Sequence, residues 1–139
     1  MKHPFPAHFV ARFHDAMNQL NPTSVETLHA FLDKFEMLDL KKGQVLLREG
    51  EVCKHLYFIL KGGIRCFMHD ANGKEINLHF YFEDELASEF KSLQMQNASE
   101  RNLVTLSASK VLRAARADYE AMFEYNIELS QGAFRFFQD

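Results

Sequence analysis

In the first 35 residues of the chain, apolar side chains recur every three or four positions, which is the spacing of helices that bury one face. This pattern predicts a first helix from Ala7 to Leu20, which the pair Asn21-Pro22 ends. Thr23 and Glu26 then fit a capping box, in which a hydroxyl and a carboxylate accept hydrogen bonds from amides at a helix start. We therefore expect the chain to open with two amphipathic helices.

From residue 36 onward the period shortens to that of β-strands separated by turns that contain glycine. One strand is expected to bury a single face, because Ile76, Leu78, Phe80 and Phe82 alternate with more polar residues. A helix is expected to follow the last strand and to begin at Asp118, its N-cap. Strands are expected at residues 37–40, 45–48, 56–61, 64–68, 76–82, 103–106 and 111–115, and helical segments at 89–96, 118–123 and 127–137.

Seven or eight short strands with regular turns are typical of a jelly roll or a barrel. The expected fold class is therefore mostly β with flanking helices, as a double-stranded β-helix or jelly-roll barrel with N-terminal and C-terminal helices. The length of 139 residues suits one domain, and the content of 47% hydrophobic and 25% charged residues is that of a globular protein.

Charge and cysteine content narrow the class of partner. A formal net charge of −3 and a pI of about 6.2 argue against autonomous nucleic-acid binding, but they permit a small anionic ligand. Cys53 and Cys66 are too few for a disulfide framework or a zinc site, and they indicate a reducing compartment. No apolar stretch resembles a signal peptide or could span a bilayer, so we expect a cytoplasmic protein without a membrane segment.

The sequence contains no recognisable catalytic motif, and we expect no enzyme activity. Its seven histidines are scattered and form no His-x-His pair, so a cupin-like metal enzyme is only a remote alternative and no metal ligand is expected. There is also no Gly-x-Ser-x-Gly nucleophile elbow.

Four stretches match the motifs of one known family in order and in spacing: residues 40–51 (LKKGQVLLREGE), 57–65 (YFILKGGIR), 72–75 (NGKE) and 111–123 (VLRAARADYEAMF). Together they resemble the cyclic-nucleotide-binding domain of the catabolite-activator (Crp/Fnr-type) transcription regulators. The resemblance implies one domain, in which residues 1–35 are helices packed on a barrel, residues 36–125 form the β-roll and residues 126–139 begin a C-terminal helix.

In that family, a cassette between two strands holds the cyclic phosphate of the ligand. The cassette contains Gly-Glu-Leu at the start of a short helix and, later, an arginine before a small residue. The matching stretch here is Ala87-Ser88-Glu89-Phe90, so Ser88 stands where glycine is expected. The resemblance implies that Glu89 accepts a hydrogen bond from the ribose hydroxyl, and that the Ser88 side chain crowds the pocket.

The sign of the charge near residue 100 decides whether such a site can hold a phosphate. Counting back from Val111 places Ser99 or Glu100 at the position of the family arginine, with Arg101 one residue away and, on a strand, on the opposite face. At about 4 Å and an effective dielectric constant of about 20, a guanidinium attracts and a carboxylate repels an anion by about 4 kcal/mol. The residues expected to bind the ligand are Ala87, Ser88, Glu89, Phe90, Ser99, Arg101 and Asn102.

Two functions remain open at this point. The first is the regulatory sensor domain of a Crp/Fnr-type transcription regulator, which binds a small anionic effector such as a cyclic AMP-like nucleotide through a diverged phosphate cassette. The second is a ligand-free dimerisation or protein-interaction module of the same fold.

The end of the chain bears on its partners. In the regulators that it resembles, a long helix after the barrel pairs two subunits and leads to a helix-turn-helix module. Residues 127–137 provide only about three helical turns. We therefore expect a homodimer through the C-terminal helix and no DNA-binding domain in this chain, whether the gene encodes a lone sensor or a longer protein has been shortened.

Overall fold

The structure is a computed structural model that describes residues 4–126 and residue 128. The helix expected at residues 127–137 therefore lies outside the described residues, apart from Glu128. The elements are α1 (Ala7–Leu20), α2 (Val25–Leu32), β1 (Glu36–Leu40), β2 (Val45–Leu47), β3 (His55–Lys61), β4 (Ile64–His69), β5 (Glu75–Tyr81), β6 (Leu86–Ala87), α3 (Phe90–Met95), β7 (Asn102–Thr105), β8 (Ser109–Ala115) and α4 (Arg116–Tyr125).

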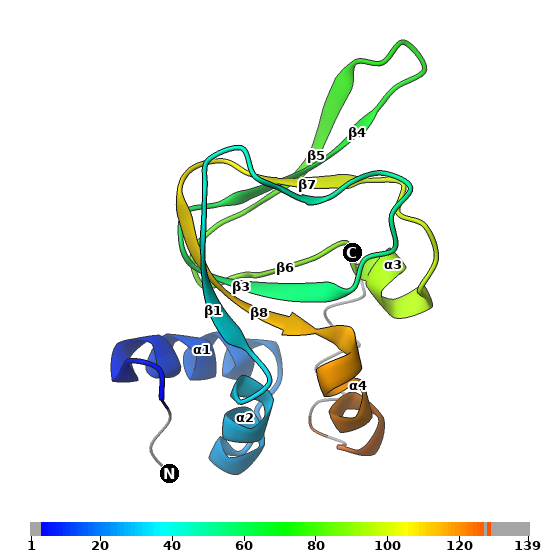
Figure 1. Cartoon of the computed structure of the whole chain (residues 1–139). Helices are drawn as coiled ribbons and strands as arrows, with labels where there is room; N and C mark the ends of the chain where they lie inside the picture. Colours follow the sequence, from blue (N-terminus) through cyan, green and yellow to red (C-terminus); the bar gives the residue numbers. More distant parts are fainter. Residues whose placement is uncertain (1–3, 127, 129–139) are drawn as a thin grey trace.

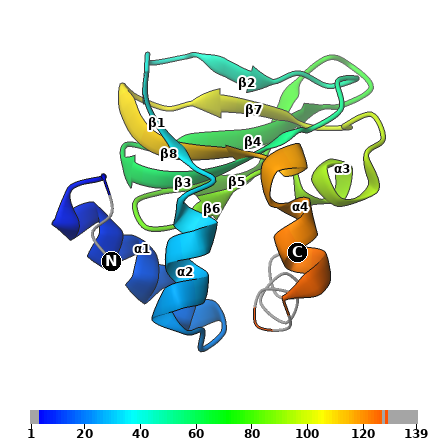
Figure 2. The ribbon, with the colours of Figure 1, turned by 60° about the horizontal axis from the view of Figure 1, so that its bottom comes forward.

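The strands form two four-stranded antiparallel sheets, in the orders β1-β8-β3-β6 and β2-β7-β4-β5. These sheets make the two layers of a jelly roll, with α1, α2 and α4 lying together on one side of it (Figures 1 and 2). The expected fold class, mostly β with helices at both ends, is confirmed. In the part of the chain that the structure describes, no helix has the length and hydropathy of a transmembrane segment.

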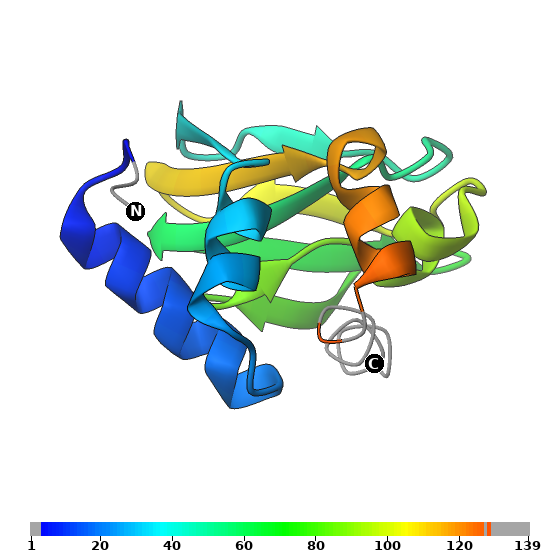
Figure 3. The ribbon, with the colours of Figure 1, turned by 90° about the horizontal axis from the view of Figure 1, so that it is seen from below.

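Phenylalanine side chains join the helices to the first sheet. The Phe13 ring of α1 lies 5.3 Å from the Phe58 ring of β3 and 5.7 Å from the Phe31 ring of α2, measured between centroids. All three side chains are fully buried, and Phe31 also lies 6.0 Å from Tyr119 of α4. Helices α1, α2 and α4, which Figure 3 shows from below, thus share one apolar core with the barrel.

Two of the predicted helix caps are wrong. Ser24, not Thr23, is the N-cap of α2, and its hydroxyl accepts a hydrogen bond from the Thr27 amide at 3.3 Å. The Thr23 hydroxyl instead donates to the Asn21 carbonyl at 2.7 Å, so it is already occupied. Helix α4 begins at Arg116, so Asp118 lies inside its first turn. A carboxylate at this position still interacts favourably with the helix dipole.

The prediction that one face of the strand at residues 76–82 is buried is also wrong. Ile76 and Phe80 are both 42% exposed, because the β4–β5 hairpin extends beyond the body of the barrel (Figure 1). A bulge causes the apolar alternation to fail along the strand. His79 pairs with Cys66, but Asn77 pairs with the next residue of β4, so Leu78 is an extra residue that shifts the side chains by one position.

Candidate functional site

Helix α3 begins with a buried carboxylate. Glu89 is its N-cap, is only 6% exposed, and accepts hydrogen bonds from the backbone amides of Lys91 at 3.2 Å and Ser92 at 3.3 Å. These amides would otherwise lack partners at a helix start, so the charge of Glu89 is stabilised by its own helix.

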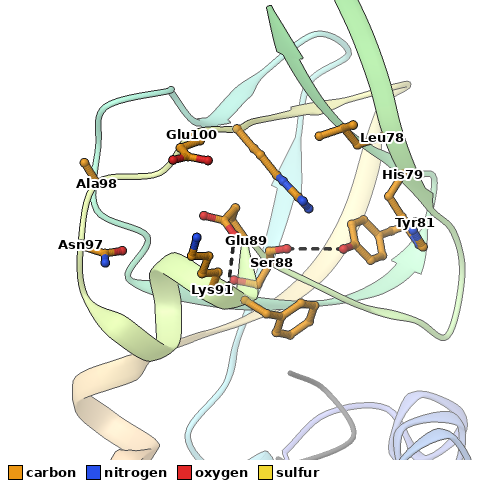
Figure 4. Close-up of a pocket in the computed structure, with 11 residues that line it drawn as sticks. Leu78, His79, Tyr81, Ser88, Glu89, Lys91, Asn97, Ala98 and Glu100 are labelled. Atoms are coloured by element: carbon orange, nitrogen blue, oxygen red, sulfur yellow. Dashed lines mark hydrogen bonds between the residues drawn. The ribbon is translucent and has the colours of Figure 1, made fainter. Parts of the chain in front are cut away.

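A cavity of about 660 Å³ lies beside α3. In Figure 4, Leu78, His79 and Tyr81 of β5 stand on one side of this cavity, and Glu89, Lys91 and Glu100 stand on the other. Its walls combine apolar, aromatic and charged groups, as is usual for small-molecule sites. The lining residues are Leu78, His79, Tyr81, Ser88, Glu89, Phe90, Lys91, Asn97, Ala98, Glu100 and Arg101.

Arg101 is the cationic group of this cavity that reaches the barrel wall. Burial raises the pKa of the Cys66 thiol of β4, and the charge and hydrogen bond of the Arg101 guanidinium act against that rise. The guanidinium therefore lies against the wall of the second sheet. Among the described residues, Arg101 makes no ion pair with a carboxylate, so its charge is available to an anion.

A turn held by Ser99 places both residues 100 and 101 at the cavity. The Ser99 hydroxyl accepts a hydrogen bond from the Arg101 amide at 3.0 Å and donates one to the Arg101 carbonyl at 2.9 Å. Strand β7 begins only at Asn102, so the alternation of a strand does not apply to Glu100 and Arg101. Both side chains line the cavity, and the choice between them that the sequence posed does not arise.

Four of the seven residues expected to bind a ligand line the cavity: Ser88, Glu89, Phe90 and Arg101. The Ser88 hydroxyl donates to the His55 carbonyl at 2.7 Å and lies 3.1 Å from the Cys53 sulfur. It is therefore bonded to the start of β3, while the Ser88 carbonyl accepts a hydrogen bond from Tyr81 at 3.5 Å (Figure 4).

The other three expected residues support the site from behind. Ala87 is fully buried in β6, and Ser99 makes the turn described above. The Asn102 side chain accepts from the Glu49 amide at 2.8 Å and donates to the Phe67 carbonyl at 3.4 Å. Because its amide is occupied by the backbone, Asn102 connects β4, β7 and the loop after β2.

Sequence reasoning missed the β5 wall of the cavity. His79 and Tyr81, whose ring centroids are 4.2 Å apart, belong to the phase of β5 that was interpreted as the polar face. They pair with Cys66 and Ile64, both of which are buried, so this phase is the one that faces the barrel. The burial of Cys66 and Ile64 would have revealed the orientation of His79 and Tyr81, but the pairing of these strands is known only from the fold.

No metal site accompanies the cavity within residues 4–126, since no group of three or more His, Cys, Asp or Glu side chains there could hold an ion. The arrangement can bind an anion at Arg101, hydroxyl groups at Glu89 and a ring against the walls formed by Tyr81 and Phe90.

Comparison with known proteins places the fold. The family model described as "Cyclic nucleotide-binding domain" matches residues 37–126. Among curated proteins, no sequence matches this chain. Many solved structures do match. Those compared below are all less than 25% identical to this chain, so their likeness shows the fold alone.

Three of these structures illustrate the range. The catabolite activator protein of Thermus thermophilus is 23% identical, with a TM-score of 0.69, over 81% of this chain and 51% of that one. The sensor domain of the transcriptional regulator DNR from Pseudomonas aeruginosa is 18% identical, with a TM-score of 0.72, over 92% and 83%. The cAMP-bound regulatory domain of Toxoplasma gondii PKA is 17% identical, with a TM-score of 0.74, over 84% and 45%. The chain thus spans about half the length of the catabolite activator.

Proposed function

The chain belongs to the cyclic nucleotide-binding domain family, and we propose that it is the sensor domain of a Crp/Fnr-type transcription regulator. In this proposal, a small anionic effector occupies the 660 Å³ cavity. The role is regulatory rather than catalytic, and its place is the cytoplasm. Likeness to the sensor domain of DNR, over 83% of that chain, supports the regulator class.

The observation that carries the proposal is Arg101. A guanidinium that lines a cavity without a carboxylate partner among the described residues is a ready anion-binding group. Arg101 is exposed, and a charge-assisted hydrogen bond from its guanidinium to an anion contributes about 1.5–3 kcal/mol. A phosphodiester is the anion that the family suggests, and cyclic AMP is the first candidate.

Glu89 can take a second contact of such a ligand. Each of its carboxylate oxygens accepts one backbone hydrogen bond within α3. A carboxylate has about four acceptor sites, so capacity remains for a ribose hydroxyl. This assignment follows the role that the family resemblance gives to the glutamate of the cassette.

The test is binding of cyclic AMP and cyclic GMP by calorimetry, together with a thermal-shift panel of nucleotides. A ligand that binds only the native state must raise the melting temperature. Arg101→Gln should weaken binding at least about tenfold, whereas Arg48→Gln, which removes an exposed charge outside the cavity lining, should leave it unchanged. If no nucleotide binds, or if both variants bind like the wild type, the proposal is wrong.

A ligand-free dimerisation module of the same fold is the second candidate. The exposed aromatic side chains Phe80 and Phe82, which are 42% and 50% exposed at the end of β5, favour it, since exposed apolar groups of this size are typical of a contact surface. It predicts a homodimer by light scattering and no nucleotide binding. Pairing through the C-terminal helix stays a prediction, because that helix lies outside the described residues.

A further inference from the structure

The charges that line the cavity are balanced rather than basic. Lys91 and Arg101 contribute two positive charges, and Glu89 and Glu100 contribute two negative ones. Glu89 is held by the amides of α3, whereas the exposed Glu100 carboxylate makes no hydrogen bond or ion pair with any residue that the structure describes. An acid and a guanidinium, neither of which has an ion-pair partner among the described residues, therefore line the same cavity.

The two opposite charges also lie within reach of one small molecule. Glu100 and Arg101 are adjacent in the chain, and consecutive Cα atoms are about 3.8 Å apart. The turn at Ser99 directs both side chains to the same cavity instead of to opposite faces. An anion that pairs with Arg101 therefore binds in a cavity that the Glu100 carboxylate also lines.

We propose that Glu100 determines the specificity of this cavity. It selects an effector that carries an ammonium or another strong N–H donor beside its anionic group, and it weakens the binding of ligands that carry only the anion. The inference rests on the proposed function, in which Arg101 holds the anion. A ligand with both charges can pair with both side chains. A plain phosphodiester pairs only with Arg101, and its negative charge is repelled by the Glu100 carboxylate.

Lys91 does not remove this effect. It lies on α3 on the same side of the cavity as Glu100 (Figure 4), but no ion pair joins it to Glu89 or Glu100 within the described part of the chain. Lys91 is exposed, and a solvent-exposed ammonium screens Glu100 less than a bound partner would.

The first experiment measures cyclic AMP affinity by calorimetry in the wild type, Glu100→Gln and Glu124→Gln. Glutamine keeps the shape of the side chain and removes its charge. Glu124 is an exposed residue of α4 outside the cavity, so it controls for the change in net charge. We expect Glu100→Gln to tighten binding about tenfold, and Glu124→Gln to leave it unchanged.

The second experiment uses two probes that differ only in the cation. Phosphoethanolamine and ethyl phosphate carry the same phosphate group, and only the first carries an ammonium. In amide chemical-shift titrations, the wild type should prefer phosphoethanolamine about fivefold to tenfold, and Glu100→Gln should lose that preference.

The outcomes separate this inference from the proposed function. If the wild type binds cyclic AMP through Arg101 but Glu100→Gln binds it no more tightly, the inference is wrong and the proposed function stands. If only Glu100→Gln binds cyclic AMP, the inference holds, and cyclic AMP is not the effector of the natural chain. If neither protein binds any of the three probes, both fail.

Discussion

The side chain of Ser99 should control both the stability of the barrel and the orientation of Arg101. Its hydroxyl makes two hydrogen bonds to the backbone of Arg101, at 3.0 and 2.9 Å, and Ser99 is only 3% exposed. Ser99→Ala removes both bonds and leaves the Arg101 amide and carbonyl without these partners. The backbone bonds of Ser99 to Gly50 and Glu51 remain, so the loop keeps its place while the turn loosens.

The size of the effect follows from these two bonds. Each contributes about 0.5–1.5 kcal/mol net, so Ser99→Ala should lower the free energy of unfolding by about 2 kcal/mol. For a domain of this length, that corresponds to a melting temperature lower by about 6–8 °C. The backbone of Arg101 also becomes less ordered. This change should weaken anion binding by the folded protein about tenfold.

Denaturant unfolding followed by calorimetry with an anionic ligand separates these two effects, because binding is measured where the variant is fully folded. Ser107→Ala, which alters an exposed serine outside the cavity, is the matched control and should resemble the wild type. A Ser99→Ala protein as stable as the wild type would refute the role of the turn. One that is less stable but binds equally well would show that the turn does not position Arg101.

Four further variants test the fold. Gly62→Ala should destabilise the protein by about 2–4 kcal/mol, because Gly62 has a φ of +99° and an added Cβ would overlap the Ser109 side chain; chemical denaturation checks it. Phe58→Ala in the core should lower the free energy of unfolding by about 3–5 kcal/mol, and Phe80→Ala on the exposed hairpin should lower it by less than about 1 kcal/mol. Equal losses would contradict the burial of Phe58 and the exposure of Phe80. Burial raises the pKa of Tyr119 above its usual 10.0, so the stability from its neutral form is complete below about pH 10 and is lost as the pH rises further; Tyr119→Phe should flatten that decline in unfolding titrations.

Much of the fold could be predicted because its signals are local. Helix α1 was predicted with its observed bounds, because its signals are short-range. Apolar residues recur at helical spacing along it, and Asn21-Pro22 directly follows its last residue. The strand order was not predictable from those signals. It was the order and spacing of the glycine turns, compared with a known family, that indicated the barrel, and the match of residues 37–126 confirms it.

Predictions failed where a single extra residue or bond changed a pattern. The bulge at Leu78 reverses which residues of β5 face the barrel, and nothing in the alternation of residues 76–82 reveals it. Thr23 and Ser24 both carry a hydroxyl near the start of α2. The Thr23 hydroxyl donates to the Asn21 carbonyl, and Ser24 is the N-cap.

The candidate site shows the same limit. Counting back along a strand from Val111 treated residues 99–101 as extended, whereas the Ser99 hydroxyl closes a turn there before β7 begins. A serine two residues before an arginine is too common a pattern to predict this turn. The sequence therefore indicated Arg101 as a candidate anion-binding residue, but it did not indicate the geometry of this residue.

The guanidinium of Arg101 can be observed directly, by following the side-chain Nε–H signals of the arginines in nitrogen-15 NMR spectra while cyclic AMP is added. We predict a saturable downfield shift of the Arg101 signal and an unchanged signal from Arg48, which lies outside the cavity lining. Saturable binding of the nucleotide with no change at Arg101 would contradict it.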